Sequence, residues 1–265
     1  MANHVGVIGA GVMGEALIAA LIRSGVNTTD ISFTEKRDER AKELEARYLI
    51  SHLSLHELLA KASTILLVVK PQDMQTTLRE MVGHCDQKTL LISFAAGKTI
   101  QSIAEEIGEN RPIVRVMPNT PALIGLGASG YSFGSGVSEE QKSFVRSFLA
   151  ATGIAIEVAE NLQDAVTATS GSGPAYFFAF VEAMVDGAVA LGLAREDATQ
   201  LTIQTITGAA ALLGQSGDSP KTLREKVTSP NGTTAAALAS FSQSELSEVV
   251  ANAMQAAAKR SQELG

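Results

Sequence analysis

Short apolar runs alternate with helical periodicity through the first 160 residues of the chain. A short run rich in Val, Ile and Leu is typical of a strand buried in a parallel sheet, whereas apolar residues that recur every three or four positions indicate an amphipathic helix. The runs that predict strands are 5–8, 31–33, 64–69, 90–94, 113–116, 127–133 and 154–158. Because these strands alternate with helices, we predict an α/β domain with a parallel sheet and helices on both faces.

The pattern changes near residue 161, after which helical periodicity continues and no strand is predicted. The expected helices cover 161–170, 175–191, 195–213, 220–227, 234–239 and 244–262. The chain is therefore predicted to fold as two domains, an α/β domain over 1–160 and an all-helical domain over 161–265.

The predicted helix at 175–191 is apolar on nearly every side, and Glu182 and Asp186 are its charged residues. Such a helix is expected to be buried all round. The rest of the helical domain offers few neighbours that could bury it. We therefore predict a homodimer with interlocked helical domains, and a larger ring of dimers is left open.

Composition and charge narrow the class of protein. The chain has 265 residues, a net charge of −7, 45% hydrophobic and 5% aromatic residues. An acidic chain offers no field that favours nucleic acid or an anionic membrane, and no apolar stretch is long enough to span a bilayer. Cys85 is the single cysteine, which excludes an intrachain disulfide and predicts a reducing, cytoplasmic location. The histidines His4, His52, His56 and His84 form no ligand pattern, so no metal site is predicted.

A glycine motif, Gly9-Ala10-Gly11-Val12-Met13-Gly14, follows the first predicted strand directly and opens a helix. In this strand–turn–helix context GxGxxG predicts a dinucleotide-binding turn, although a glycine-rich turn without a ligand is the simpler alternative. Gly9 permits the tight turn, Gly11 lets the backbone approach a pyrophosphate, and Gly14 lets the helix pack closely on the strand.

The end of the second predicted strand carries Glu35, Lys36 and Arg37, and Arg40 lies in the following helix. In a dinucleotide-binding fold this is where the adenosine ribose is recognised: an acid accepts from a 2′-hydroxyl, and a cation pairs with a 2′-phosphate. The cations favour NADPH as the cofactor, and Glu35 keeps NADH as an alternative. A solvated helix start is the simpler explanation of the basic residues.

Two more strand ends are expected to face the same ligand, because ligands bind at the carboxyl ends of parallel strands. Val68-Val69-Lys70-Pro71 lies at the end of one strand, where Pro71 blocks further ladder bonding. A merely exposed side chain is the alternative explanation of Lys70. Ala95-Ala96-Gly97 ends the next strand, and its small residues allow a ring or a ribose to approach the backbone.

The stretch Ser229-Pro230-Asn231-Gly232-Thr233-Thr234 is predicted to be a loop that opens a helix. A helix N-terminus presents unpaired backbone N–H groups and the positive end of the helix dipole, and this suits a small carboxylate. An ordinary helix cap without a ligand is the simpler alternative, since Ser, Thr and Asn are common caps.

Six motifs occur in the order that is typical of pyrroline-5-carboxylate reductases, and the chain resembles this family over nearly its whole length. The motifs are Gly9–Gly14, Val69–Pro71, Ala95–Gly97, Met117–Pro121, Ser170–Ala175 and Thr228–Thr234. The resemblance implies a Rossmann-like doubly wound sheet followed by an all-helical dimerisation domain. It also implies hydride transfer from NAD(P)H to 1-pyrroline-5-carboxylate, which yields L-proline in the last step of proline biosynthesis.

The motifs and the resemblance together name the candidate site residues. The cofactor-binding candidates are Ile8, Gly9, Ala10, Gly11, Val12, Met13, Gly14, Lys36, Arg37, Val68, Val69, Lys70, Pro71, Phe94, Ala95 and Ala96. The substrate-binding candidates are Ser229, Asn231, Gly232, Thr233 and Thr234. Thr234 is also the candidate catalytic residue, because the resemblance implies that it lies nearest the ring nitrogen of the substrate.

The chain departs from the family pattern at two of these places. Asn231 replaces a Gly that is usual in the loop, and Asn tolerates positive φ better than other residues with a side chain. Leu55 stands about where the family often has an Asn near the adenosine.

A protonated imine accepts hydride without a strong proton donor, because the product is an amine. Thr234 is therefore expected to orient the ring nitrogen rather than to act as a decisive acid.

Two other functions compete with this hypothesis. A reductase of the β-hydroxyacid dehydrogenase group shares the glycine start and a helical second domain, but its chemistry needs a Lys acid. The segment 161–220 offers Arg195 as its single cation, which argues against that group. A non-catalytic, dimeric NADP-sensing module would keep the glycine motif but would need no anion loop at 229–234.

Overall fold

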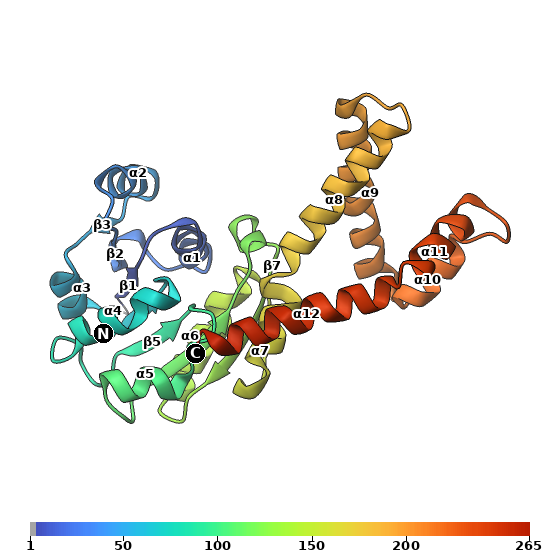
Figure 1. The fold of residues 1–265 in the computed structure, drawn as a ribbon. Coiled ribbons are helices and arrows are strands. Elements are labelled where there is room, and N and C mark those ends of the chain that lie inside the picture. Colours follow the sequence, from blue (N-terminus) through green and yellow to red (C-terminus); the bar gives the residue numbers. More distant parts are fainter. Residues whose placement is uncertain (1–3) are drawn as a thin grey trace. The chain divides into compact units, whose positions relative to one another are not determined.

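A computed structural model describes residues 4–265 of the chain. The described residues form two compact units (Figure 1). One unit contains the chain up to Pro174 together with Ala256–Gly265, and the other contains Ala175–Gln255. The domains expected from the sequence, 1–160 for cofactor binding and 161–265 for dimerisation and substrate binding, stay a prediction. The compact units divide the chain after Pro174, and Ala256–Gly265 belongs to the first unit.

The first unit is built on one eight-stranded sheet with the order β3-β2-β1-β4-β5-β6-β7-β8 (Figure 1). The strands found in the described part of the chain are β1 Val5–Ile8, β2 Ile31–Thr34, β3 Ser51–His52, β4 Thr64–Leu67, β5 Leu90–Ser93, β6 Ile113–Met117, β7 Gly127–Phe133 and β8 Gly153–Glu157. Strand β3 was not predicted, because two residues are too few to show a period. The doubly wound α/β sheet predicted from the sequence is confirmed.

The parallel sheet expected from the sequence has one exception, since β6 and β7 pair antiparallel. A parallel pair needs a crossover of about a dozen or more residues, usually through a helix. The chain between Met117 and Gly127 holds only the short 3₁₀ turn η3, Thr120–Ile124. This connection is too short for a crossover, so the chain turns back. Strand β8 then pairs parallel with β7.

Helices cover both faces of the sheet, as alternating strands and helices predict. They are α1 Val12–Arg23, α2 Asp38–Tyr48, α3 Leu55–Lys61, α4 Met74–Met81, α5 Ile100–Ile107 and α6 Glu139–Ala150. Helices α1, α2 and α6 share one apolar core with strand residues such as Val7 and Ile92. Helices α3, α4 and α5 share a second core with strand residues such as Ile8 and Leu91. Successive strand residues thus fill opposite cores, which follows from the alternation of side chains along a strand.

The remaining elements are helical. They are η4 Glu160–Leu162, α7 Gln163–Val166, a π-helical turn η5 over Thr167–Gly171, α8 Gly173–Ala190, α9 Arg195–Ser216, α10 Pro220–Lys226, α11 Thr233–Gln243 and α12 Leu246–Glu263. Within Ala175–Gln255, only Val185, Ala198 and Thr202 are buried. The second unit thus has helices but almost no core of its own.

Helix α8 is the segment that the sequence predicts to be buried on every side. In the single chain Phe177 and Phe178 are instead 61% and 62% exposed. Among the described residues no helix has both the length and the apolar character that crossing a membrane requires. Phe177 and Phe178 are thus mostly exposed in one copy of the chain, whereas the Phe180 ring of α8 lies near the Phe241 ring of α11.

Candidate functional site

The candidate cofactor residues lie at the point where the order of the sheet reverses. Strand β1 has β2 on one side and β4 on the other, and Ile8 is in register with both Thr34 and Leu67. Leu67 is in register with Ser93 on β5. The segments that follow these strands therefore start at one edge of the sheet, and such a switch point is where doubly wound sheets bind ligands.

The glycine turn has the geometry that its spacing predicts. Gly9 has φ +93°, and a Cβ there would lie 2.8 Å from the Val68 carbonyl oxygen. A Cβ on Gly14 would overlap the Gly9 carbonyl oxygen, so only glycine fits. A Cβ on Gly11 would meet nothing within 4 Å. The turn is thus closed where helix packs on strand and open where a pyrophosphate would approach.

Helix α1 begins directly after this opening. Its N-cap is Gly11, and no side chain caps the helix in the described structure. The first backbone N–H groups of α1 are consequently left for a ligand, with the positive end of the helix dipole behind them.

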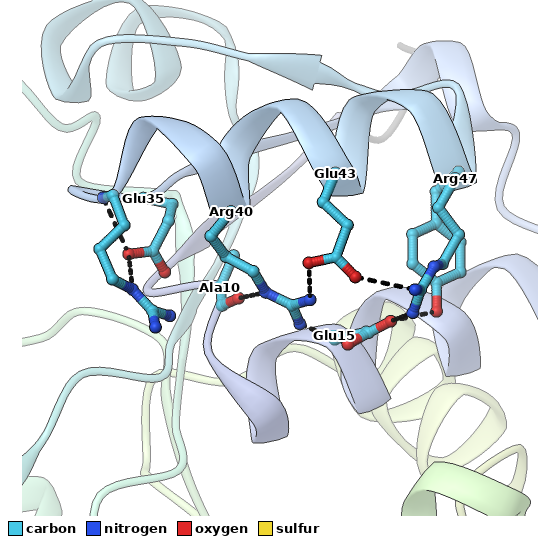
Figure 2. A network of polar contacts seen from close by, with 8 residues as sticks. Ala10, Glu15, Glu35, Arg40, Glu43 and Arg47 are labelled. Atoms are coloured by element: carbon cyan, nitrogen blue, oxygen red, sulfur yellow. Dashed lines mark hydrogen bonds and ion pairs between the residues drawn. The ribbon is translucent and has the colours of Figure 1, made fainter.

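The loop after β2 holds charged residues that pair with each other. Glu35 accepts hydrogen bonds from the backbone nitrogen and from Nε of Arg37, both at 3.1 Å (Figure 2). Burial alone would raise the pKa of Glu35, but the hydrogen bonds from Arg37 outweigh it and hold the pKa below its usual value. Glu35 is therefore ionised at neutral pH. Lys36 and Arg37 are exposed.

Arg40 of α2 links this helix to α1. Its guanidinium pairs with Glu15 on α1 and with Glu43 on α2, and its Nε donates to the Ala10 carbonyl at 3.4 Å. Figure 2 shows Arg40 and Arg47 pointing from one face of α2 toward Glu15. The suggestion from the sequence that Arg40 supports NADP binding is thus weakened, because acidic side chains and a carbonyl of the protein already occupy its donors.

The other two strand ends contribute mostly backbone. Val68 donates its N–H to the Ile8 carbonyl at 2.9 Å, and Phe94 donates to the Leu67 carbonyl at 3.0 Å. The Phe94 ring stacks edge-on against Phe148 of α6, with centroids 6.4 Å apart, so its side chain belongs to the core. Ala95 is buried, Val68, Val69, Pro71 and Ala96 are half-buried, and Lys70 is exposed.

The loop at 229–234 opens α11 as the sequence predicts. The helix begins at Thr233 with Gly232 as its N-cap, and no side chain caps it in the described structure. Asn231 has φ +59°, which confirms the expectation that Asn would take over a position suited to Gly. A Cβ on Gly232 would overlap the Ser229 Oγ, so the turn is tight.

The side chains of this loop differ in exposure. Ser229, Asn231 and Thr233 are exposed, and Gly232 and Thr234 are half-buried. The Gly232 N–H donates to the Ser229 carbonyl at 3.0 Å, and the Ala236 N–H donates to the Gly232 carbonyl at 3.1 Å. The backbone N–H groups in the first turn of α11 lie between these two hydrogen bonds in the sequence, and no side chain caps them. This arrangement suits a carboxylate.

The structure thus gathers the strand-end candidates at one sheet edge and the loop candidates in one turn of the second unit. Glu15 as the partner of Arg40 could not be read from the chain, because the two residues are 25 positions apart. No group of three or more His, Cys, Asp or Glu side chains in residues 4–265 is arranged to hold a metal ion.

A Rossmann-like sheet with a glycine turn at its switch point is the architecture of a dinucleotide-binding domain. In agreement, residues 4–97 match the family model described as NADP oxidoreductase, coenzyme F420-dependent. Residues 160–264 match the model described as pyrroline-5-carboxylate reductase dimerisation.

Similar proteins agree over almost the whole chain. The pyrroline-5-carboxylate reductase of Corynebacterium melassecola is 40% identical over 98% of each chain. That of Pseudomonas aeruginosa is 41% identical over 98% of this chain and 96% of its own. The crystal structure of a Plasmodium falciparum pyrroline carboxylate reductase with NADP bound is 31% identical, with a TM-score of 0.90 over 100% of this chain and 99% of that one. The chain belongs to the pyrroline-5-carboxylate reductase family.

More distant solved structures share the fold alone. A prephenate dehydrogenase from Aquifex aeolicus is 12% identical, with a TM-score of 0.55 over 92% of this chain and 97% of its own. The far more similar full-length relatives carry the reductase name, and they disfavour both a β-hydroxyacid dehydrogenase and a non-catalytic sensing module.

Proposed function

We propose that the chain reduces 1-pyrroline-5-carboxylate to L-proline with hydride from NAD(P)H, the last step of proline biosynthesis. The observation that carries this proposal is the match, at 40% identity and over 98% of both chains, to a relative that bears the reductase name. The uncapped helix end at Gly232 adds a site suited to the substrate's carboxylate.

The residues at the sheet edge fit a dinucleotide. A Cβ on Gly11 would have no protein atom beyond its own neighbours within 4 Å, and the N-terminus of α1 has no side-chain cap. We assign the pyrophosphate to Gly9–Gly14, with Ile8 behind it, and the remaining contacts to Val68–Pro71 and Phe94–Ala96. Lys36 and Arg37 would meet a 2′-phosphate, which makes NADPH the proposed cofactor and NADH an alternative. A bound cofactor supplies the hydride.

The loop at 229–234 would hold the substrate. The backbone N–H groups at the start of α11 bind the carboxylate, together with the side chains of Ser229, Asn231 and Thr233. Thr234 hydrogen-bonds the ring nitrogen and orients the imine carbon for hydride transfer. Hydride adds to that carbon, the electron pair of the C=N bond moves to nitrogen, and the protonated imine becomes the amine of proline without a further acid.

We also propose that the active form is a homodimer with interlocked helical domains. The matched dimerisation model covers α8–α12, and Phe177 and Phe178 of α8 are more than half exposed in one chain. A second copy would bury these apolar side chains. Sedimentation at micromolar concentration tests the proposal, because a monomer there would contradict it, and the same runs would reveal any larger ring of dimers.

The decisive assay measures NADPH consumption and proline formation together. Purified chain, NADPH and 1-pyrroline-5-carboxylate are expected to give one proline per NADPH oxidised. 1-Pyrroline, which lacks the carboxylate, is the matched control and is expected to react far more slowly. NADPH binding without turnover would favour the sensing module instead, and oxidation of β-hydroxyacids would favour the rival reductase. The cytoplasmic location stays a proposal that cell fractionation tests.

A further inference from the structure

The last residues of the chain contact the loop that follows β5. Residues 256–265 belong to the first unit, although helix α12 begins at Leu246 among residues of the second. A Cβ on Gly97 would lie 2.6 Å from the Ser261 carbonyl oxygen and 2.8 Å from the Leu264 Cβ. The backbone at Gly97 therefore contacts the C-terminal turn directly, and a side chain at this position would not fit.

Residues of the loop and residues of the C-terminal turn both contribute to this contact. A Cβ on Gly265 would lie 2.6 Å from the Gly97 carbonyl oxygen. Lys98 donates from Nζ to the Gly265 carbonyl at 3.2 Å. Gly97 has φ +78°, a conformation that side-chain-bearing residues rarely adopt. The loop thus accommodates residues 261–265 because Gly97 has no side chain and has a positive φ.

A polar cluster that includes the buried residues Ser261 and Arg115 holds the C-terminal turn next to this contact. Ser261 is 2% exposed and donates its hydroxyl to Asp164 Oδ1 at 2.7 Å. Asp164 pairs with Arg115, which is 4% exposed, at 3.4 Å. Because Ser261 donates to the carboxylate that Asp164 pairs with the Arg115 guanidinium, its hydrogen bond is of the stronger, charge-assisted kind.

The same cluster holds the far end of the loop. Arg115 also pairs with Glu160 at 3.6 Å. Glu160 Oε1 accepts a hydrogen bond from the Ile100 N–H at 2.6 Å, where helix α5 begins. The segment between Phe94 and Ile100 is therefore held at Gly97 by the C-terminal turn and at Ile100 by the polar cluster, and Ser261 joins the two.

We infer that Ser261 is a positioning residue for the cofactor loop, and that the C-terminal turn sets the backbone of Phe94–Ala96 against the bound cofactor. This inference rests on the proposed role of that loop in cofactor binding. Loss of the Ser261 hydrogen bond to Asp164 would let the segment between Phe94 and Ile100 shift. The shifted backbone would then fit the cofactor less well. The expected signature is weaker cofactor binding with unchanged affinity for the imine.

Fluorescence titration with NADPH, in the absence of substrate, tests the inference on the full chain. Ser261→Ala is expected to raise the Kd for NADPH about tenfold, the size of one charge-assisted hydrogen bond. Lys259→Ala, an exposed change on the same helix, is the matched control and is expected to bind like wild type. Ser261→Thr retains the hydroxyl and is expected to restore most of the affinity.

A second variant separates positioning from stability. A chain that ends at Ser261 loses the Leu264 and Gly265 contacts to Gly97 but keeps the bond to Asp164. It is also expected to raise the Kd for NADPH, with the KM for 1-pyrroline-5-carboxylate within about twofold of wild type. If both altered chains fold and bind NADPH as wild type does, or if only their melting temperature falls, the inference is overturned.

The outcomes also distinguish the inference from the proposed function. Wild-type chain that binds NADPH but forms no proline refutes the function and leaves the titration as a test of Ser261. Wild-type chain that binds neither NADPH nor NADH refutes both.

Discussion

The carboxylate of Glu35 accepts two hydrogen bonds from Arg37, one from its backbone nitrogen and one from Nε, each at 3.1 Å. The pair stands in the loop after β2, where a doubly wound fold meets the adenosine ribose. The Arg37 side chain is 67% exposed, and its contact with Glu35 uses Nε. The terminal nitrogens of the guanidinium thus stay available to a 2′-phosphate.

The first prediction concerns this loop. Changing Lys36 and Arg37 together to Ala is expected to raise the KM for NADPH about tenfold or more, and to change the KM for NADH much less, because only NADPH has the 2′-phosphate. Steady-state kinetics with each cofactor measure the difference. Lys42→Ala, an exposed change on α2, is the control. Equal effects on the two cofactors would remove the argument for a 2′-phosphate site.

The second prediction separates two glycines of one motif. Gly14→Ala is expected to destabilise the fold by about 1–3 kcal/mol, because its Cβ would press on the backbone oxygen of Gly9. Gly11→Ala is expected to leave the melting temperature near that of wild type and to weaken NADPH binding about tenfold or more, because its Cβ fills the open side of the turn. Thermal melting and NADPH titration of both variants give the comparison. Similar behaviour of the two would contradict the assigned geometry.

The third prediction concerns Thr234. Thr234→Ala is expected to lower kcat/KM for 1-pyrroline-5-carboxylate about 10-fold to 100-fold, the range of one hydrogen bond to a charged group. The Kd for NADPH is expected to stay the same, because the cofactor is assigned to the other unit. Ser240→Ala, an exposed change on the same helix, is the control. Unaltered turnover in Thr234→Ala would show that the assigned role is wrong.

The fourth prediction is a pH dependence that originates at Glu15. Burial alone would raise the pKa of Glu15, but hydrogen bonds from Arg40, Tyr48 and Arg47 outweigh it and hold the pKa below the ordinary value of 4.5. A carboxyl group with a lowered pKa in the fold stabilises it above the unfolded pKa, and this contribution is lost as the pH falls through the folded pKa. Glu15 should therefore stabilise the protein at neutral pH but not in acid.

The Glu15→Gln variant measures this contribution. At pH 7 it is expected to lose about 1–3 kcal/mol of unfolding free energy, because the Glu15 side chain is 12% exposed and its removal leaves Arg40 without a buried partner. Below the folded pKa the variant and wild type should be equally stable. Glu43→Gln, at a more exposed site on α2, is the control and should cost about 0.5 kcal/mol or less. A gap that is the same at every pH would rule out the assigned titration.

Much of the fold could be predicted because its signals are local. A buried strand and an amphipathic helix each show their period within a few residues, and Gly9 and Gly14 occupy positions where any side chain would meet backbone within 3 Å. The helix start at Thr233 and the positive φ of Asn231 followed from turn chemistry in one hexapeptide. The antiparallel turn between β6 and β7 was missed, because strand direction depends on the length of a connection and not on the pattern within either strand.

The sequence by itself therefore determined the strands, the helices, the glycine turn and the family to which the chain belongs. Only the tertiary structure decided which distant side chains meet. A surface Arg looks the same in sequence whether a cofactor or an acid will pair with it, and Arg40 proved to be held by Glu15, 25 positions away. Likewise Ser261 reaches Asp164 across 97 positions. Such pairs are set by how whole elements pack, and no local period records that packing.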